Sequence, residues 1–301
     1  MKRGIFVAAC ALLMMACAHK PPPPPPQPPP PPPPKGDLLR FKAKAGDAAK
    51  SRVKLTIEQE QAAAQGDKRG ASKPVTLTFS FGEEETIDSV APDHSMIISA
   101  RLVDAVGEGS AGTSQQMVDD MALAFDELKI QFKRQERGDV MAIAMSGLRK
   151  PLDEATARGV LNAIYGAQRG PLFPEEHVDV GGTWKTTMPI PSTAGFEGEV
   201  HYDYTYARKG AGVAVIGCEG RFEGKRPQGA AMQKLSGKSS AEYRFEVEAG
   251  RLVGSSVDQM TQVEGAIAGQ EALRLGVRQH IRVEWNLDAG GGETNKDQPQ
   301  Q

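Results

Sequence analysis

The sequence predicts an α+β fold in which a strongly curved, half-barrel-like antiparallel β-sheet wraps around two helices. Two observations predict the sheet: apolar and polar residues alternate over much of the chain, and tight-turn residues separate the alternating runs. A third observation predicts the helices, because two segments in the middle of the chain carry apolar residues at helical spacing. Strands on both sides of a helical middle are typical of α+β domains.

The first alternating runs lie before residue 105. Apart from Ile97, the residues between the apolar ones are Lys, Thr, Ser, Glu or Arg, which predicts strands with one face in the core and one in water. The runs are 53–58 (VKLTIE), 75–81 (VTLTFSF) and 96–102 (MIISARL). The glycine-rich residues 107–112 then predict a flexible loop, because they match neither a nucleophile elbow nor a phosphate-binding loop.

Residues 114–127 predict the first helix and residues 151–165 the second. Ser114 is a suitable cap for the first, whose apolar stripe is Val118, Met121, Ala122 and Phe125. The second has Pro151 in its first turn and is followed by Gly166. Between the helices, 130–133 and 141–145 predict two strands joined at Gly138-Asp139.

After the second helix the sequence predicts long hairpins. Residues 200–206 and 213–222 flank the turn Lys209-Gly210-Ala211-Gly212, and residues 243–247 and 252–257 flank Glu248-Ala249-Gly250. Residues 281–287 form the last strand of a globular domain that spans 37–288. Residues 289–301 predict a disordered polar tail.

Two resemblances follow from this pattern. A curved sheet around helices resembles the periplasmic lipoprotein carriers of the LolA and LolB type, which implies a similar architecture. Residues 173–184, with Val178-Asp179-Val180-Gly181-Gly182-Thr183-Trp184, resemble a "Pro…Val-x-Val-Gly-Asp-x-Trp" phrase of uncharacterised bacterial envelope lipoproteins. Gly182 replaces the usual Asp of that phrase, and the resemblance implies kinship without an activity.

Residues 1–16 predict a signal peptide. Lys2 and Arg3 precede the uncharged apolar run 5–15, about half the ~20 residues that a membrane-spanning helix needs. The run ends in Leu13-Met14-Met15-Ala16-Cys17, which resembles the lipobox of bacterial lipoproteins. The resemblance implies cleavage after Ala16 and a lipid-modified Cys17; the alternative is a conventional cleavage site at which Cys17 is an ordinary residue. Ala18 implies the periplasmic face of the outer membrane.

Residues 17–36 predict a lipidated N-terminus and a stalk. Residues 21–34 are proline except for Gln27, so they favour polyproline II and a rod of roughly 43 Å. The stalk can hold the domain away from a membrane; a docking site for a proline-reading partner, or passage through peptidoglycan, is the alternative.

The remaining residues give no signature of catalysis, cofactor or metal. Without Lys2 and Arg3 the chain has 34 basic and 38 acidic residues, which argues against nucleic-acid binding. No histidine spacing predicts a metal site, and Glu175-Glu176-His177 is typical of a solvated loop. Glu83-Glu84-Glu85 is likewise interpreted as a solvated charged run. Cys10 leaves with the signal peptide and Cys17 carries lipid, so Cys218 is the only thiol of the folded part. It follows the apolar residues 214–217, which predicts a small core residue.

Tyr202, Tyr204 and Tyr206 form an aromatic stripe at strand spacing. They can line a groove for lipid or sugar, or pack in the core across neighbouring strands. The sequence therefore favours a non-enzymatic envelope protein, anchored through lipid on Cys17, that binds an apolar ligand such as lipid or another envelope component. An accessory subunit of an envelope complex is the alternative, and an envelope hydrolase the third hypothesis.

Overall fold

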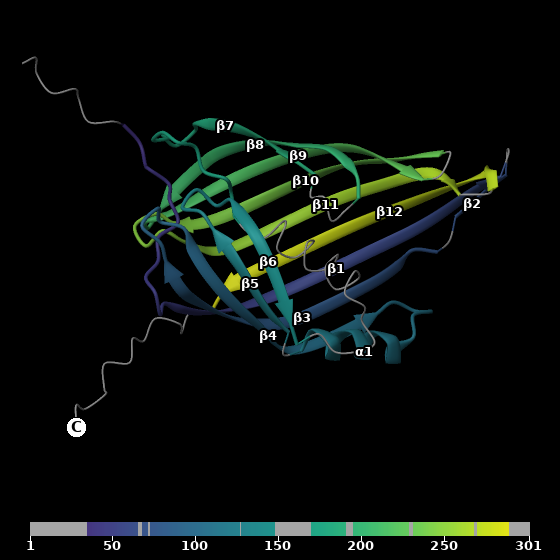
Figure 1. Ribbon diagram of the computed structural model, residues 1–301, viewed down its shortest axis with the longest axis horizontal. Coiled ribbons are helices and arrows are strands. Elements are labelled where there is room, and N and C mark those ends of the chain that lie inside the picture. Colours follow the sequence, from purple (N-terminus) through teal and green to yellow (C-terminus); the bar gives the residue numbers. More distant parts are fainter. Residues whose placement is uncertain are drawn as a thin grey trace, which may run out of the picture. The chain divides into compact units, whose positions relative to one another are not determined.

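Nearly all of the described chain is β-sheet. The computed structural model describes residues 35–65, 68–71, 73–126, 128–147, 170–190, 195–228, 231–267 and 270–288. Within these residues there are twelve strands in one antiparallel sheet and one helix (Figure 1). The antiparallel sheet is confirmed, but the α+β prediction is wrong, because one short helix accompanies a sheet of long strands. The second predicted helix (151–165), residues 1–34 with Cys17, and the tail (289–301) lie outside the described residues.

Eleven strands follow one another across the sheet in the order β6-β5-β4-β3-β1-β12-β11-β10-β9-β8-β7, and β2 pairs only with β1. The two outermost strands, β6 and β7, are not paired with each other, so the sheet is not closed. The strands are β1 (Ala48–Gln65), β2 (Lys68–Ala71), β3 (Val75–Val90), β4 (Met96–Gly109), β5 (Lys129–Arg134), β6 (Val140–Ser146), β7 (Thr183–Pro189), β8 (Glu197–Gly210), β9 (Val213–Gln228), β10 (Ala231–Glu246), β11 (Arg251–Ile267) and β12 (Gln270–Leu287).

The predicted hairpins are confirmed. The β5–β6 turn, the β8–β9 turn and the β10–β11 turn each contain a glycine with positive φ, where a side chain would be strained. These glycines are Gly138 (φ 100°), Gly212 (φ 80°) and Gly250 (φ 67°). The glycine-rich loop was placed too early, because β4 continues to Gly109.

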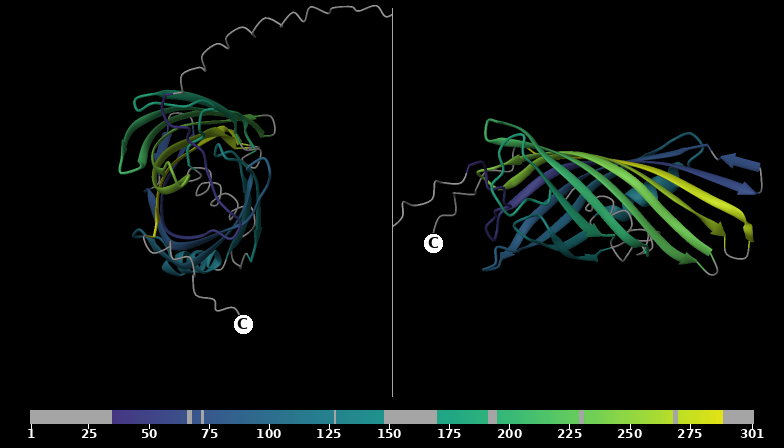
Figure 2. Two further views of the ribbon diagram at one scale, coloured as in Figure 1. Left: turned by 90° about the vertical axis from the view of Figure 1, so that its left-hand side faces the viewer. Right: turned by 90° about the horizontal axis from the view of Figure 1, so that it is seen from above.

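The sheet has an apolar inner face and a charged outer face. Side chains alternate between the faces along each strand. On β4, for example, Met96, Ile98, Ala100 and Leu102 are buried on the inner face and the residues between them are not. Figure 2, left, shows that the sheet is strongly bent, so that the β3–β6 part (blue to teal) curls round below the β8–β11 part (green to yellow-green). The core therefore lies on the concave side.

Helix α1 (Gln115–Phe125) is the first predicted helix and packs on the inner face. Ser114 caps it by accepting a hydrogen bond from the Met117 amide at 3.4 Å. The Phe125 ring lies edge-on to Phe79 of β3, with centroids 5.8 Å apart. Gly107 of β4 permits this approach, since a Cβ there would lie 2.6 Å from a Val118 methyl.

The sheet has two distinguishable ends. We call the end that holds Lys35 and the turns 134–140, 210–213 and 246–251 the near end, and the opposite end, where β9 meets β10, the far end. None of the described residues forms a helix long and apolar enough to cross a lipid bilayer.

Candidate functional site

The segment that follows the predicted stalk is fastened to the near end of the sheet. Asp37 and Val178 exchange two backbone hydrogen bonds of 3.0 Å. The Asp37 carboxylate also accepts hydrogen bonds from the Tyr206 hydroxyl and the Lys209 ammonium, both at 2.7 Å. Burial opposes ionisation of Asp37, but the bonds from Lys209 and Tyr206 outweigh it and lower its pKa. Asp37 is therefore a charged anchor point at neutral pH.

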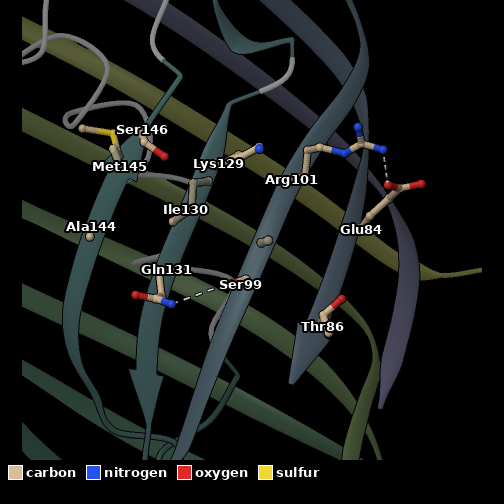
Figure 3. A pocket seen from close by; sticks show the side chains of 11 residues that line it. Glu84, Thr86, Ser99, Arg101, Lys129, Ile130, Gln131, Ala144, Met145 and Ser146 are labelled. Carbon is tan, nitrogen blue, oxygen red and sulfur yellow. Dashed lines mark hydrogen bonds and ion pairs between the residues drawn. The ribbon is translucent and has the colours of Figure 1, made fainter. Parts of the chain in front are cut away.

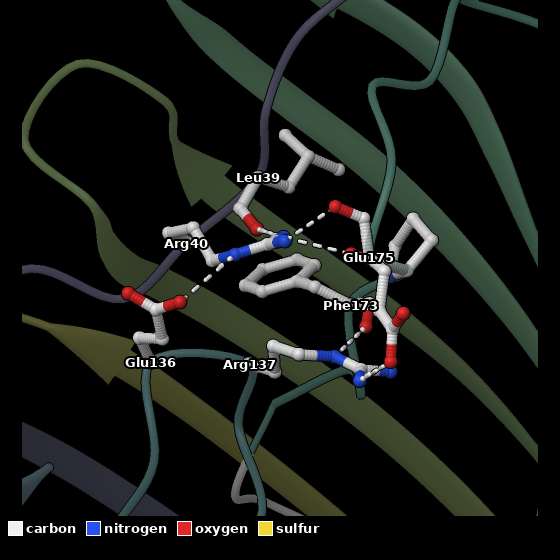
Figure 4. Close-up of polar contacts among 7 residues, drawn as sticks. Leu39, Arg40, Glu136, Arg137, Phe173 and Glu175 are labelled. Carbon is white, nitrogen blue, oxygen red and sulfur yellow. Dashed lines mark hydrogen bonds and ion pairs between the residues drawn. The ribbon is translucent and has the colours of Figure 1, made fainter. Parts of the chain in front are cut away.

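Arg40 strengthens the attachment (Figure 4). Its guanidinium donates to the carbonyl oxygens of Leu39, Pro174 and Glu175, each at 2.7 Å. Its Nε lies 3.4 Å from the Glu136 carboxylate. One side chain thus joins residues 39–40 to residues 174–175 and to the β5–β6 turn. We call residues 37–41, with these contacts, the entry clamp.

The apolar side chains of the entry clamp belong to the core. Leu39 and Phe41 are 0% and 5% exposed. The Phe41 ring contacts Phe173 and Phe245, with both centroid distances 5.3 Å, and the Arg134 guanidinium lies 4.8 Å from its centroid. The chain that begins at residue 35 is therefore joined to the core through the buried side chains of Leu39 and Phe41.

The three tyrosines of the predicted stripe all lie on the inner face of β8. Tyr204 and Tyr206 are buried, and Tyr202 is partly buried. Tyr204 stacks on Trp184 of β7, with centroids 5.2 Å apart, and Tyr206 bonds Asp37 as described above. Burial raises the pKa of Tyr202 to about 12. The stripe thus takes part in core packing and in the entry clamp; its role in lining a groove stays a prediction.

Two carboxylates lie on the inner face among the core side chains. The strand period that buries Phe79 and Phe81 turns Glu83 and Glu85 inward and Glu84 outward. Glu83 is 2% exposed and accepts hydrogen bonds from Trp285 Nε1 at 3.0 Å and from the Ser51 hydroxyl at 3.1 Å. The interpretation of this run as solvated is therefore wrong for Glu83, whereas Glu84 points outward and forms surface ion pairs.

Glu85 can hold a proton near neutral pH. Burial, followed by the charge of Glu83, raises the pKa of Glu85 to about 7, although the Arg134 charge acts in the other direction. Nearby on the same face, the buried Ser255 hydroxyl has no hydrogen-bond partner within the described chain; Ser255 lies opposite Trp285. The inner face therefore offers proton-accepting and hydrogen-bonding groups, which the interpretation of the glutamate run as solvated had missed.

Toward the far end, apolar side chains of the inner face remain partly exposed. Val277 of β12 lies opposite Val263 of β11, which lies opposite Leu235 of β10. All three are only partly buried. We call these three residues the far apolar row. On β9, Gly224 lies opposite Leu235, and a Cβ added at Gly224 would lie 2.8 Å from the Cδ1 atom of Ile190. The row is a candidate surface for an apolar ligand.

Cys218 and His177, which could have carried chemistry, lie among residues that they contact as part of the fold. Cys218 is a buried free thiol whose pKa burial raises to about 12, which confirms its place in the core. His177 makes a contact of 3.1 Å with the Gly36 carbonyl oxygen. Across the residues that the structure describes, no group of three His, Cys, Asp or Glu side chains could hold a metal ion.

No protein-family model matches this chain, and no curated protein sequence matches it either.

Proposed function

We propose that the protein is a lipid-anchored, non-enzymatic module of the bacterial cell envelope that binds an apolar ligand on the inner face of its sheet. The far apolar row carries this proposal. Its three side chains lie side by side across three strands and are partly exposed on the concave side. Burying such aliphatic surface under a ligand stabilises the complex by about 25 cal/mol per Å².

The anchor rests on the sequence of residues 13–17, and the entry clamp supports it. A chain that is held through Cys17 and a stiff stalk needs a firm attachment where the stalk meets the domain. The buried Leu39 and Phe41 and the bonds of Arg40 supply that attachment.

Native mass spectrometry of the protein purified from its own membrane tests the ligand. We expect a noncovalent lipid-sized mass in addition to any lipid on Cys17. Val263→Glu places a charge in the far apolar row and should abolish the bound mass. Met260→Glu is the matched control, because Met260 lies on the same strand, is 42% exposed and sits on the outer face. A wild-type protein without bound lipid, or a Val263→Glu protein that keeps it, would overturn the proposal.

Mass spectrometry of the N-terminal peptide tests the anchor separately. The expected peptide begins at Cys17 and carries fatty acids. A peptide that begins elsewhere, or that has no acyl chains, would remove the anchor without affecting the ligand experiment.

The edge of β6 favours a second function, an accessory subunit of an envelope complex. β6 contains no charged residue, and none of the described strands pairs with its outer edge. An uncharged free edge can accept a strand from a partner. Cross-linking in cells would then identify a stoichiometric partner protein, whereas a ligand carrier predicts none.

A further inference from the structure

A band of uncharged polar side chains crosses the inner face of the sheet between the apolar core and the far apolar row. Gln59 of β1 lies opposite Gln279 of β12, which lies opposite Thr261 of β11. In the neighbouring row toward the core, Gln259 of β11 lies opposite Ser239 of β10. All five are only partly buried, and the strand period places them on the same face as the core. We call these five residues the inner polar band.

Three members of the inner polar band have hydrogen-bonding groups that the fold does not use. Gln259 donates to the Thr261 hydroxyl at 3.1 Å. The amides of Gln59 and Gln279 and the hydroxyl of Ser239, by contrast, have no hydrogen-bond partner within the residues that the structure describes. Each amide has one acceptor oxygen and two N–H donors. Because these groups are only partly buried, water can reach them, and a ligand can replace that water.

Glutamine amides on the outer face are bonded to the protein itself. At the groove formed by β3, β4, β5 and β6, Gln131 donates to the Asp88 carboxylate at 3.0 Å and to the Ser99 hydroxyl at 3.5 Å (Figure 3). On β11, Gln262 donates to the Glu264 carboxylate at 2.6 Å. Two amides of the inner polar band, however, remain available to a ligand.

The inner polar band contains no charged side chain. On the same face, Glu83 lies eight residues along β3 from Val75, the partner of Gln59, which is about 26 Å. Arg226 lies beyond the far apolar row and donates to Gln233 Oε1 at 3.0 Å. The band itself therefore offers no counter-charge to a charged group, and such a group would lose water without compensation there.

The inner polar band is wide, and an aromatic ring lies beside it. Gln59 and Ser239 lie on β1 and β10, three places apart in the sheet, so the band spans about 14 Å. Gly220 and Tyr202 continue the row of Ser239, and a Cβ at Gly220 would overlap the Ser239 hydroxyl. The Tyr202 hydroxyl also has no hydrogen-bond partner in the described part of the chain. A ligand that fills the band therefore needs several hydrogen-bonding groups.

We propose that the ligand of the inner face is an amphiphile with an uncharged headgroup that carries several hydroxyl groups, as a glycosyl group does. This rests on the proposed function: the apolar chain lies on the far apolar row and the headgroup on the inner polar band. A hydroxyl both donates and accepts hydrogen bonds, so it matches Gln59 and Gln279, whose amides do both. The Tyr202 ring adds an apolar surface and a hydroxyl beside Ser239.

Isothermal titration calorimetry on the full chain in phosphatidylcholine nanodiscs, with empty nanodiscs as the blank, tests the headgroup. The probes are octyl maltoside, octanoate and octyltrimethylammonium, each below its micelle concentration. They share the apolar chain and differ in the charge of the headgroup. We expect saturable binding of octyl maltoside that is about tenfold or more tighter than that of either charged probe.

Variants test the location of the headgroup. Gln279→Leu replaces an amide without a described partner by an apolar side chain of similar size, and should weaken octyl maltoside binding about fivefold or more. The urea midpoint of this variant without ligand should not fall. Gln262→Leu is the matched control, because Gln262 lies on the outer face of the neighbouring strand. Equal losses of binding for the two variants, or a lower midpoint for Gln279→Leu, would overturn the inference.

Val263→Glu separates this inference from the proposed function. If the three probes bind equally and all lose affinity in Val263→Glu, the apolar site stands and the headgroup inference is overturned. If none of the three binds saturably, the headgroup inference and the proposed ligand site both fail.

Discussion

At the residue scale, the Glu83 carboxylate is the acceptor for two buried donors. Trp285 Nε1 and the Ser51 hydroxyl both donate to the same oxygen, Oε2. Glu83→Leu removes this acceptor and leaves both donors buried, and each such group costs about 1–3 kcal/mol. We expect the free energy of unfolding to fall by about 2–6 kcal/mol, measured by urea denaturation.

Glu84→Leu is the control, because Glu84 is the neighbouring residue but points outward. It loses only surface ion pairs, which typically contribute about 1 kcal/mol or less. Equal destabilisation by the two substitutions would contradict the inward placement of Glu83.

Glu85 makes a contribution to stability that depends on pH. Burial and the charge of Glu83 raise its pKa from the ordinary 4.5 to about 7 in the folded chain, so the folded state holds the proton more tightly. Stability must therefore fall as the pH rises from about 4.5 to 7 and then level off. Glu85→Gln should remove this decline, on the order of 1–2 kcal/mol for a partly buried group. Urea midpoints from pH 4.5 to 8 measure it; parallel curves for both proteins would refute it.

The alternation of residues in the sequence predicts an inward position for Glu83 and Glu85, although their charge suggests a solvated one. Extending the period-two frame of Phe79 and Phe81 by two and four residues places both carboxylates on the inner face. Their partners could not be predicted in this way. Trp285 is separated from Glu83 by 202 residues, and only the pairing of distant strands brings the two together.

At the scale of elements, Arg40 contributes several of the polar contacts of the entry clamp. Arg40→Ala removes the guanidinium that bonds three carbonyl oxygens. We expect residues 35–41 to open more often, with amide hydrogen exchange about tenfold faster in that peptide. The Phe41 amide, bonded to the Glu136 carbonyl oxygen at 2.7 Å, is the best single probe.

Lys42→Ala is the matched control for this prediction. Lys42 directly follows this segment, but its ammonium makes a single exposed hydrogen bond of 3.4 Å, to the Glu248 carbonyl oxygen. If Lys42→Ala accelerated amide exchange in residues 35–41 as much as Arg40→Ala, the guanidinium contacts would not be what holds these residues in place.

The sequence predicted strands and the helix correctly where apolar side chains alternate or recur at helical spacing. The apolar alternation near residues 53–57 and 96–102 and the stripe of α1 predicted their elements correctly. The far parts of the strands were missed, as in β10, whose first half reads AMQKLSGK. Glycine, serine and lysine there give no apolar alternation, and backbone ladder bonds to both neighbours hold the strand instead.

At the scale of the whole sheet, β1 joins the two halves by pairing with β12. Fifteen residue pairs, from Ser51–Leu287 to Gln65–Leu273, connect the two strands. No local pattern specifies this contact, because its partners are separated by more than 200 residues and the register follows from matching apolar faces. The α+β expectation arose because residues 114–127 and 151–165 predicted two helices beside the sheet, whereas the described residues form one short helix and twelve strands.

A disulfide can test that register directly. Lys54 and Glu284 lie opposite each other on the outer face, and both are exposed. Directly opposed Cβ atoms are about 4.5–5.5 Å apart, within slight adjustment of disulfide geometry. Lys54→Cys combined with Glu284→Cys should cross-link on oxidation, run faster on a non-reducing gel and gain about 2–4 kcal/mol of stability.

The mismatched pair Lys54→Cys with Arg278→Cys provides the control, because position 278 lies six residues along the same face of β12, about 20 Å from the partner of Lys54. The native Cys218 does not compete, since it is buried and its raised pKa keeps it a thiol. Cross-linking of the mismatched pair as readily as the matched one would mean that β12 pairs in another register. In that register Trp285 would lie six residues from its present partner Val53, too far to donate to Glu83.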